Sequence, residues 1–202
     1  MLLQLIPFFT ASILLTLSPG PDIIYVLVQS MSNGKKAGIV TTLGLVSGIL
    51  IHTSFVAFGV SAVIKASPVL FTLIKIFGAL YLFYLAYKVF RSDSSIAISD
   101  VPAKRSRNLF RQGFIMNVLN PKVTIFFLAF FPGFLWEPDG NTILQFYILG
   151  FLFMMQALLI FGAVALLAGK ISSYLMQHRR SGVFLKWIQI VVFVGIGFLI
   201  LI

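Results

Sequence analysis

The chain has 202 residues, of which 59% are hydrophobic and only 10% are charged, and its mean hydropathy is +1.05. Soluble domains carry about 25% charged residues, so this composition excludes a soluble protein. The net charge of +10 would suit a nucleic-acid partner. The basic residues, however, gather in alternate connections between apolar segments, and this distribution argues against nucleic-acid binding. The absence of cysteine excludes disulfides, thiol redox relays and thiolate metal sites.

The first apolar segment, Leu2–Met31, is interrupted by Ser18-Pro19-Gly20-Pro21-Asp22. Each proline lacks a backbone donor and costs a helix interior about 3 kcal/mol or more, and glycine tolerates unusual dihedral angles. A broken helix at membrane depth is tolerated only where its backbone is buried in protein or lines a watery cavity. We therefore predict two half-helices that meet at an unwound segment. We expect no cleavable signal peptide, because no basic residue precedes the apolar run.

Two continuous spans follow, at Ile39–Ile64 and Pro68–Val89. The small residues Gly44 and Gly48 are four positions apart, a spacing that predicts close packing against another helix. His52 lies in the middle of the second span. Its imidazole titrates near neutral pH when unperturbed and is a candidate proton relay, although such a residue more often makes one interhelical hydrogen bond.

The polar connection from Arg91 to Arg111 precedes a fourth span, Gln112–Trp136, which is broken at Asn120-Pro121-Lys122. We interpret the connection as a solvated cytoplasmic linker whose basic end faces lipid headgroups. The second break again places a proline and a formal charge where a membrane helix should be continuous and neutral. Two such breaks, one in each half of the chain, point to the substrate site of a transporter.

Thr142–Leu167 and Val183–Ile202 complete six candidate spans, each close to the length of about 20 residues that a bilayer requires. The two halves resemble each other weakly. Leu17-Ser18-Pro19 matches Leu119-Asn120-Pro121 at an offset of 102 residues. Because each half holds three spans, the halves must insert in opposite directions, which is an inverted repeat.

The predicted fold is therefore an all-α membrane protein with six transmembrane helices in an inverted 3+3 repeat, the first and fourth of them broken at proline motifs. We predict a single integral membrane domain over residues 1–202. Its parts would be a first repeat at 1–90, a cytoplasmic linker at 91–111 and a second repeat at 112–202.

Of the 15 basic residues, 12 lie in the first, third and fifth connections. The even connections hold only Lys65 and Lys75 at or near them, and the fourth carries Glu137 and Asp139 instead. Cytoplasmic loops of membrane proteins are enriched in Lys and Arg. This asymmetry predicts a bacterial inner-membrane protein with odd connections in the cytoplasm and both termini outside.

Asp22 is the only acidic residue inside any span. An ionised carboxylate at the bilayer centre costs about 2.5–3.5 kcal/mol on insertion scales, so Asp22 must pair, face a cavity or bind a proton. One interpretation is an N-cap of the second half-helix. The other is a proton-coupling group or a ligand for a substrate ammonium, while the half-helix N-terminus would suit a carboxylate. The two interpretations are compatible.

Lys122 has two similar interpretations: a structural counter-ion of Asp22, or a contact for a substrate carboxylate. Asn117 and Asn120 add uncharged donors and acceptors on the same segment, and Ser18 and Asn120 could instead satisfy backbone groups freed by the prolines. The residues expected to bind the substrate or couple its transport are Ser18, Pro19, Gly20, Pro21, Asp22, Asn117, Asn120, Pro121 and Lys122, with His52 as a possible relay.

Ser18-Pro19-Gly20-Pro21-Asp22 resembles the N-terminal signature of the LysE/RhtB amino-acid exporters, and Gly113–Lys122 resembles the second signature of that family. The apolar run Phe126–Phe134 and the motif Gly78–Leu82 also match. The resemblance covers essentially the whole chain. One departure is Gly133, where the family pattern suggests a polar residue, often Gln.

The resemblance implies export of amino acids or close derivatives, such as homoserine, threonine, lysine or leucine, driven by the proton-motive force as an antiport. The implied partners are the amino acid, a proton and the lipid bilayer, with no cofactor, no metal and no nucleic acid; homo-oligomerisation is left open. The alternatives are a cation or metal exporter of similar fold and a membrane assembly protein without transport. An enzyme is not expected, because a lone intramembrane carboxylate cannot form a paired acid site.

Overall fold

The computed structural model describes residues 2–93, 106–178 and 181–201, and every regular element in this part of the chain is a helix. Four helical segments are long and apolar enough to cross a membrane without interruption, Lys35–Val63, Pro68–Arg91, Thr142–Leu175 and Ser181–Leu201. The number rises to six if two bent helix pairs each count as one span.

The two bent pairs lie where the sequence predicts broken helices. The first joins α1 (Leu2–Leu17) to α2 (Pro21–Asn33) with a bend of 54°. The second joins α6 (Ser106–Val118) to α7 (Pro121–Ile125) and the short helices that follow it, with a bend of 46°. Pro21 and Pro121 each occupy the first turn of the new half-helix, where the missing N–H costs nothing.

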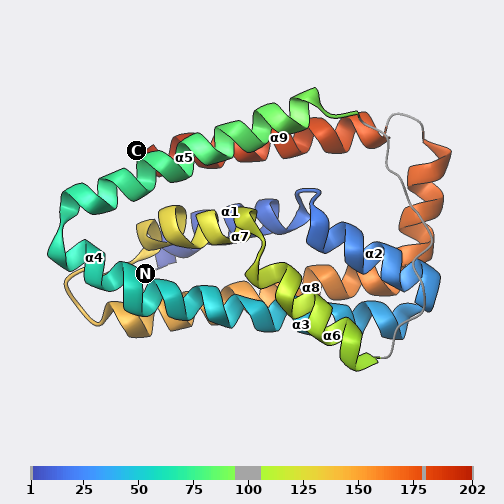
Figure 1. The fold of residues 1–202 in the computed structure, drawn as a ribbon, viewed down its shortest axis with the longest axis horizontal. Coiled ribbons are helices and arrows are strands. Elements are labelled where there is room, and N and C mark those ends of the chain that lie inside the picture. The colour runs from blue at the N-terminus through green and yellow to red at the C-terminus, as the bar shows by residue number, and fades with distance from the viewer. Residues whose placement is uncertain (1, 94–105, 179–180, 202) are drawn as a thin grey trace.

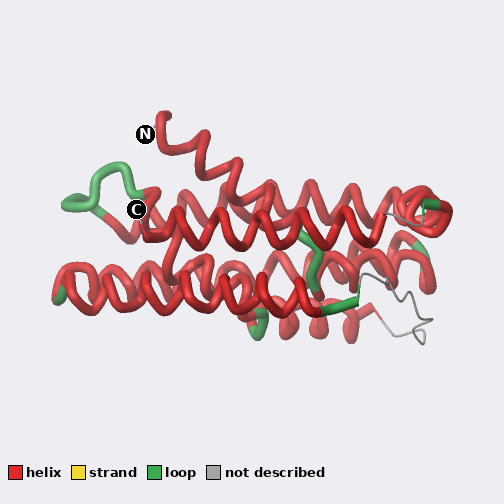
Figure 2. The backbone as a smooth tube through the Cα atoms, turned by 90° about the horizontal axis from the view of Figure 1, so that it is seen from above, coloured by secondary structure: helices red, strands yellow, loops and turns green. Residues whose placement is uncertain are grey.

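The remaining helices lie on either side of the bent pairs. The antiparallel helices α5 (Pro68–Arg91) and α9 (Ser181–Leu201) run side by side along one edge of the bundle (Figure 1). On the opposite side, α3 (Lys35–Ser54) packs against α6 and against the antiparallel α8 (Thr142–Gln177). Figure 2 shows the N-terminal end of α1 standing clear of the other helices.

Close packing of α3 against α6 depends on glycine, as the spacing of Gly44 and Gly48 predicts. A Cβ atom added at Gly44 would meet the backbone of Phe110, and one added at Gly48 would lie 2.7 Å from the Asn117 side-chain oxygen. On α6, a Cβ atom at Gly113 would lie 2.5 Å from the Thr41 carbonyl oxygen. These glycines bring the two backbones together and hold Asn117 against α3.

Several helix boundaries differ from the sequence prediction. The fifth span was expected to end at Leu167, but α8 continues to Gln177, because hydropathy falls at Lys170 while the residues from there to Gln177 include no helix-breaking proline or glycine. Two π-helical stretches, Phe55–Val60 and Phe126–Phe130, were not predicted. A π turn adds a residue to a helix without changing its apolar character, so hydropathy gives no signal of it.

A cluster of phenylalanines fills the bundle between the second break and the loop before α8. Phe127 stacks on Phe131 with ring centroids 4.3 Å apart, and Phe126 lies 5.6 Å from Phe153. Tilted and edge-to-face contacts dominate, as the quadrupoles of aromatic rings favour. The fully buried members are Phe8, Phe126, Phe127, Phe131 and Phe146.

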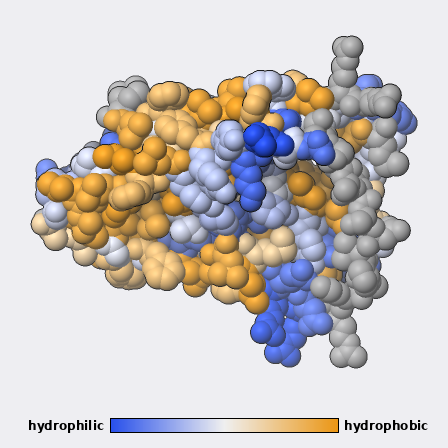
Figure 3. Space-filling view, turned by 45° about the horizontal axis from the view of Figure 1, so that its top comes forward, coloured by the Kyte–Doolittle hydropathy of each residue, from blue (hydrophilic) through white to orange (hydrophobic). Residues whose placement is uncertain are grey.

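Apolar side chains also cover most of the outside. Large exposed residues such as Leu159, Phe77 and Val191 are 74%, 67% and 65% accessible, respectively. In Figure 3 apolar side chains dominate the half of the molecule that holds both chain ends, and polar ones gather towards the other. A surface this apolar is suited to contact with lipid chains.

Candidate functional site

The two breaks meet in the middle of the bundle through Lys122. Its side chain is 8% exposed, and its ammonium donates hydrogen bonds to the carbonyl oxygens of Leu15, at 2.9 Å, and Ser18, at 3.0 Å. The end of a helix leaves its last carbonyls without partners, and a cation is well suited to them. The second half of the chain therefore stabilises the break in the first half.

Gly20 provides the space for this contact. A Cβ atom at Gly20 would lie 3.2 Å from the Lys122 nitrogen and 3.7 Å from the adjacent carbon. Its backbone is extended, with φ at −174°, so the requirement for glycine arises from the closeness of the ammonium and not from the dihedral angle.

Asp22 lies beside this contact without forming an ion pair with Lys122. Its carboxylate is 5% exposed, and one oxygen accepts a hydrogen bond of 3.2 Å from the Asn117 side chain. The prediction that Asp22 caps α2 is wrong: Gly20 is the N-cap residue and no side chain caps the helix. Asp22 is the second residue of α2, and its side chain points across to α6 instead of back to its own helix.

Asn117 connects Asp22 to a third span. Its side chain donates to Asp22, and its backbone carbonyl oxygen lies 3.0 Å from Nε2 of His52 on α3. His52 is buried and its ring lies 5.6 Å from that of Phe127. His52 therefore makes the interhelical hydrogen bond that sequence reasoning favoured, and a role in proton relay stays a prediction.

Asn120 caps the second half-helix. Its side-chain oxygen accepts a hydrogen bond of 3.1 Å from the backbone N–H of Lys122. Its amide group faces the Asp22 carboxylate but has no hydrogen bond in good geometry. The suggestion that this asparagine satisfies a backbone group freed by the break is thus confirmed, whereas the hydroxyl of Ser18 is buried without any partner.

Unsatisfied polar atoms are concentrated at this centre. Buried polar groups are almost always hydrogen-bonded, so each exception needs an explanation. The partnerless atoms at the two breaks are Asp22 Oδ1, Asn117 Oδ1, the hydroxyl of Ser18 and the Asn120 amide nitrogen. The first two are acceptors and the last two are donors.

The polar centre encloses only a small cavity. It has a volume of about 20 Å³ and is lined by Asp22, Asn117 and Lys122 together with apolar residues that include Ile23 and Phe153. A water molecule needs about 10–15 Å³, so the cavity offers room for one water and none for an amino acid. This structure is closed around the centre, and a larger ligand would have to part the helices.

The contact between Lys122 and the first break was not predicted from the sequence. The carbonyl oxygens of Leu15 and Ser18 bind its ammonium. The sequence did offer one indication of this contact, because the last carbonyls of α1 lack intrahelical donors and need a donor from elsewhere.

The chain is similar to known proteins over most of its length. The model of the family described as "LysE type translocator" matches residues 13–202. A membrane protein of Bacillus subtilis described as "Uncharacterized membrane protein YrhP" is 30% identical, with 96% of each chain aligned. The "Homoserine/homoserine lactone efflux protein" of Salmonella typhimurium is 29% identical over 86% of this chain and 84% of its own. No solved structure matches.

Proposed function

Because the chain belongs to the LysE type translocator family, we propose that it is a secondary exporter of an amino acid or a close derivative. The observation that carries this proposal is the buried centre between the two breaks, which places a carboxylate and an ammonium in an otherwise apolar bundle. A zwitterion complements both charges at once. The efflux activity named for the relative from Salmonella typhimurium supports the same class of substrate.

The unsatisfied atoms suggest how a zwitterion would lie. Its ammonium would meet the acceptors Asp22 Oδ1 and Asn117 Oδ1. Its carboxylate would meet the Ser18 hydroxyl, the Asn120 amide and the ammonium of Lys122, which has three donors and uses two of them on carbonyls. The N-terminus of α2, whose first N–H groups lack intrahelical acceptors, would add to the carboxylate side.

Asp22 is the residue that we propose to couple transport to the proton-motive force. It is the one acid inside the spans, and one of its oxygens is unpartnered. Proton binding would remove its charge when the substrate leaves, so that a costly unpaired carboxylate is not left in the membrane. His52 is connected to Asp22 through Asn117 and is the candidate relay. The protein would thus act as an antiporter.

For the architecture we propose six spans in an inverted 3+3 repeat. The order of a bent pair, a long span and a second span occurs twice, and the matched helices α3 with α8 and α5 with α9 run antiparallel (Figure 1). Both chain ends lie at one end of the bundle, and the helix ends that border the first, third and fifth connections lie towards the other. The positive-inside rule would place the termini outside a bacterial inner membrane.

The orientation can be tested with single cysteines, because the natural chain has none. The predicted linker, residues 91–111, lies largely outside the described residues, so probes at Ser32 and Asp139, both exposed, are preferable. An impermeant thiol reagent should label Asp139→Cys but not Ser32→Cys in intact cells. The reverse pattern would overturn the orientation.

The function is tested by an efflux assay in cells loaded with a mixture of dipeptides, with mass spectrometry of the released amino acids. Expression of the protein should raise the release of a subset of them, and an uncoupler should abolish the increase. Release that is unchanged for every amino acid, with the protein present in the membrane, would refute the exporter and leave an assembly role. Among the described residues no group of three or more metal-ligating side chains gathers, so the cation-exporter alternative gains no support there.

A further inference from the structure

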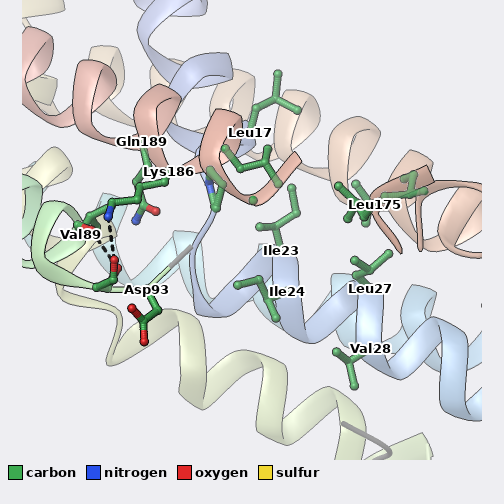
Figure 4. Close-up of a pocket in the computed structure, with 16 residues that line it drawn as sticks. Leu17, Ile23, Ile24, Leu27, Val28, Val89, Asp93, Leu175, Lys186 and Gln189 are labelled. Carbon is green, nitrogen blue, oxygen red and sulfur yellow. Dashed lines mark hydrogen bonds between the residues drawn. The ribbon is translucent and has the colours of Figure 1, made fainter. Parts of the chain in front are cut away.

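A second and larger cavity lies beside the first break. It has a volume of about 320 Å³ and is walled by α2, α8 and the facing ends of α5 and α9 (Figure 4). Ligand sites commonly have volumes of about 300–1,000 Å³, so one small molecule fits. The cavity therefore offers the space for an amino acid that the polar centre itself lacks.

The large cavity and the small cavity of the polar centre share one lining residue. Ile23 lines both cavities, and it directly follows Asp22 in α2. Leu17 and Pro19, which belong to the first break, complete this inner wall. A molecule in the large cavity is thus separated from the charged centre by the Ile23 side chain and the loop of the first break.

One wall of the cavity is polar and lies where α5 ends and α9 begins. There the ammonium of Lys186, at the start of α9, donates a hydrogen bond of 2.7 Å to the carbonyl oxygen of Ser92, at the end of α5. Asp93 and Gln189 lie next to this contact (Figure 4). This polar wall therefore presents both signs of charge, whereas the walls formed by α2 and α8 are aliphatic.

The walls formed by α2 and α8 offer no charged partner for a substrate side chain, and the charged residues of the lining, Asp93 and Lys186, lie on the polar wall. Ile24, Leu27 and Val28 of α2 face Leu175 of α8 across the cavity. An uncharged aliphatic group is favoured by such walls, but a charged group would lose its water without gaining a partner. This lining discriminates between substrates by side chain, because every amino acid carries the same charged groups at its α-carbon.

We propose that the large cavity is the access vestibule for the substrate from the cytoplasm, and that it selects amino acids with uncharged aliphatic side chains over basic ones. This inference rests on the proposed export function. The substrate, and not a lipid chain, is the occupant because charged groups lie both on the polar wall of the cavity and in the polar centre beyond Ile23. Ile23 separates the two cavities and acts as the inner gate.

Single-cysteine labelling tests the vestibule directly. In inverted membrane vesicles, a hydrophilic maleimide should label Ile24→Cys on the vestibule wall. It should not label Leu159→Cys, which lies on the lipid-facing surface of α8 with 74% exposure. Leucine should slow the labelling of Ile24→Cys. Lysine should need a concentration about tenfold or more higher for the same protection, as expected of discrimination by an apolar pocket.

Each contrary result overturns a distinct part of the proposal. Labelling of Ile24→Cys only from the outside of right-side-out vesicles would refute cytoplasmic access. Equal protection by lysine and leucine would refute the selectivity. Protection by added phospholipid and by no amino acid would identify a lipid cavity. Efflux by the wild-type protein is measured in parallel. If the wild type exports amino acids but no amino acid protects Ile24→Cys from labelling, the vestibule alone is refuted. If the wild type exports no amino acid, the exporter is refuted.

A second pair of variants keeps the test valid if Ile24→Cys does not fold. Leu175 is half-buried, faces the vestibule and lies at the basic end of the bundle, where water can reach a new charge. In Leu175→Glu, lysine should compete for efflux better than in wild type and leucine worse. Leu175→Gln, the matched uncharged variant, should show no gain for lysine. Unchanged competition in Leu175→Glu would refute the role of the vestibule in selection.

Discussion

The first and second breaks look alike in sequence but differ in how their freed backbone groups are satisfied. At the second break, Asn120 caps α7 with its own side chain. At the first, Gly20 provides no side-chain cap, and the buried carbonyls of Leu15 and Ser18 are satisfied by Lys122 from the other half of the chain. The second break satisfies a freed backbone group with its own side chain, whereas the freed carbonyls of the first break are satisfied only when the second half of the chain packs against it.

This difference assigns separate tasks to the two halves. The first half contributes an acid whose second oxygen is unpartnered, together with the carbonyls that bind Lys122, and the second half contributes the cation and the amides. A site with two identical breaks would offer the same groups twice. The divergence of the breaks is what makes the centre complementary to a molecule with one positive and one negative group.

The largest expected effect is that of Lys122→Ala. Loss of the ammonium would leave two buried carbonyls without donors, at a cost of about 1–3 kcal/mol each, and would remove the buried cation beside Asp22. Export should be abolished. Lys75→Ala, which changes a half-buried lysine on α5, should transport normally. The double variant Asp22→Asn with Lys122→Gln should recover expression but not export.

Binding measurements separate the two roles of Lys122. One outcome is that purified Lys122→Ala binds the amino acid as tightly as the wild-type protein and that export fails only because less protein folds. In that case Lys122 stabilises the first break and does not contact the substrate. A loss of binding in protein that remains folded supports both roles.

Asp22→Asn should have the next largest effect and should leave the fold intact, since an amide can keep a hydrogen bond to Asn117. Efflux driven by a pH gradient should be lost, while exchange of labelled for unlabelled substrate persists in part. Asp139→Asn, an exposed acid outside the spans, should not change efflux. Efflux by Asp22→Asn at the wild-type rate with the same pH dependence would exclude Asp22 as the coupling group.

Gly48→Ala is a smaller perturbation that acts through Asn117. The added Cβ atom would lie 2.7 Å from the Asn117 side-chain oxygen and would force α3 and α6 apart or displace Asn117 from Asp22. Overpacking of this kind costs about 1–3 kcal/mol. Thermal unfolding in detergent should shift down and export should fall. Gly162→Ala, where nothing lies within 4 Å, is the control, and equal effects of both changes would contradict this explanation.

The helices and breaks followed from the sequence because local rules decide them. Proline, glycine and hydropathy located α1, α2 and α7 to within a few residues, whereas α6 begins at Ser106, inside the segment predicted as a linker and before the predicted start at Gln112. The identity of the partner groups did not follow, because it depends on segments more than a hundred residues apart, such as Lys122 with Leu15. One of the two interpretations of Asp22, as the N-cap of α2, is wrong because the sequence does not reveal which residue of the break remains extended.

The smallest expected effect separates the two functions of Asn120. Asn120→Ala removes the cap of α7 and should cost about 1 kcal/mol, as should Asn141→Ala at the N-cap of α8. Asn120→Ser restores an oxygen acceptor for the Lys122 N–H but not the amide that faces Asp22. We therefore expect Asn120→Ser to recover thermal stability without recovering full export, whereas Asn141→Ala should lose stability alone. Full recovery of export in Asn120→Ser would show that the second break contributes a cap and a cation to the site, and that its amide takes no part in binding.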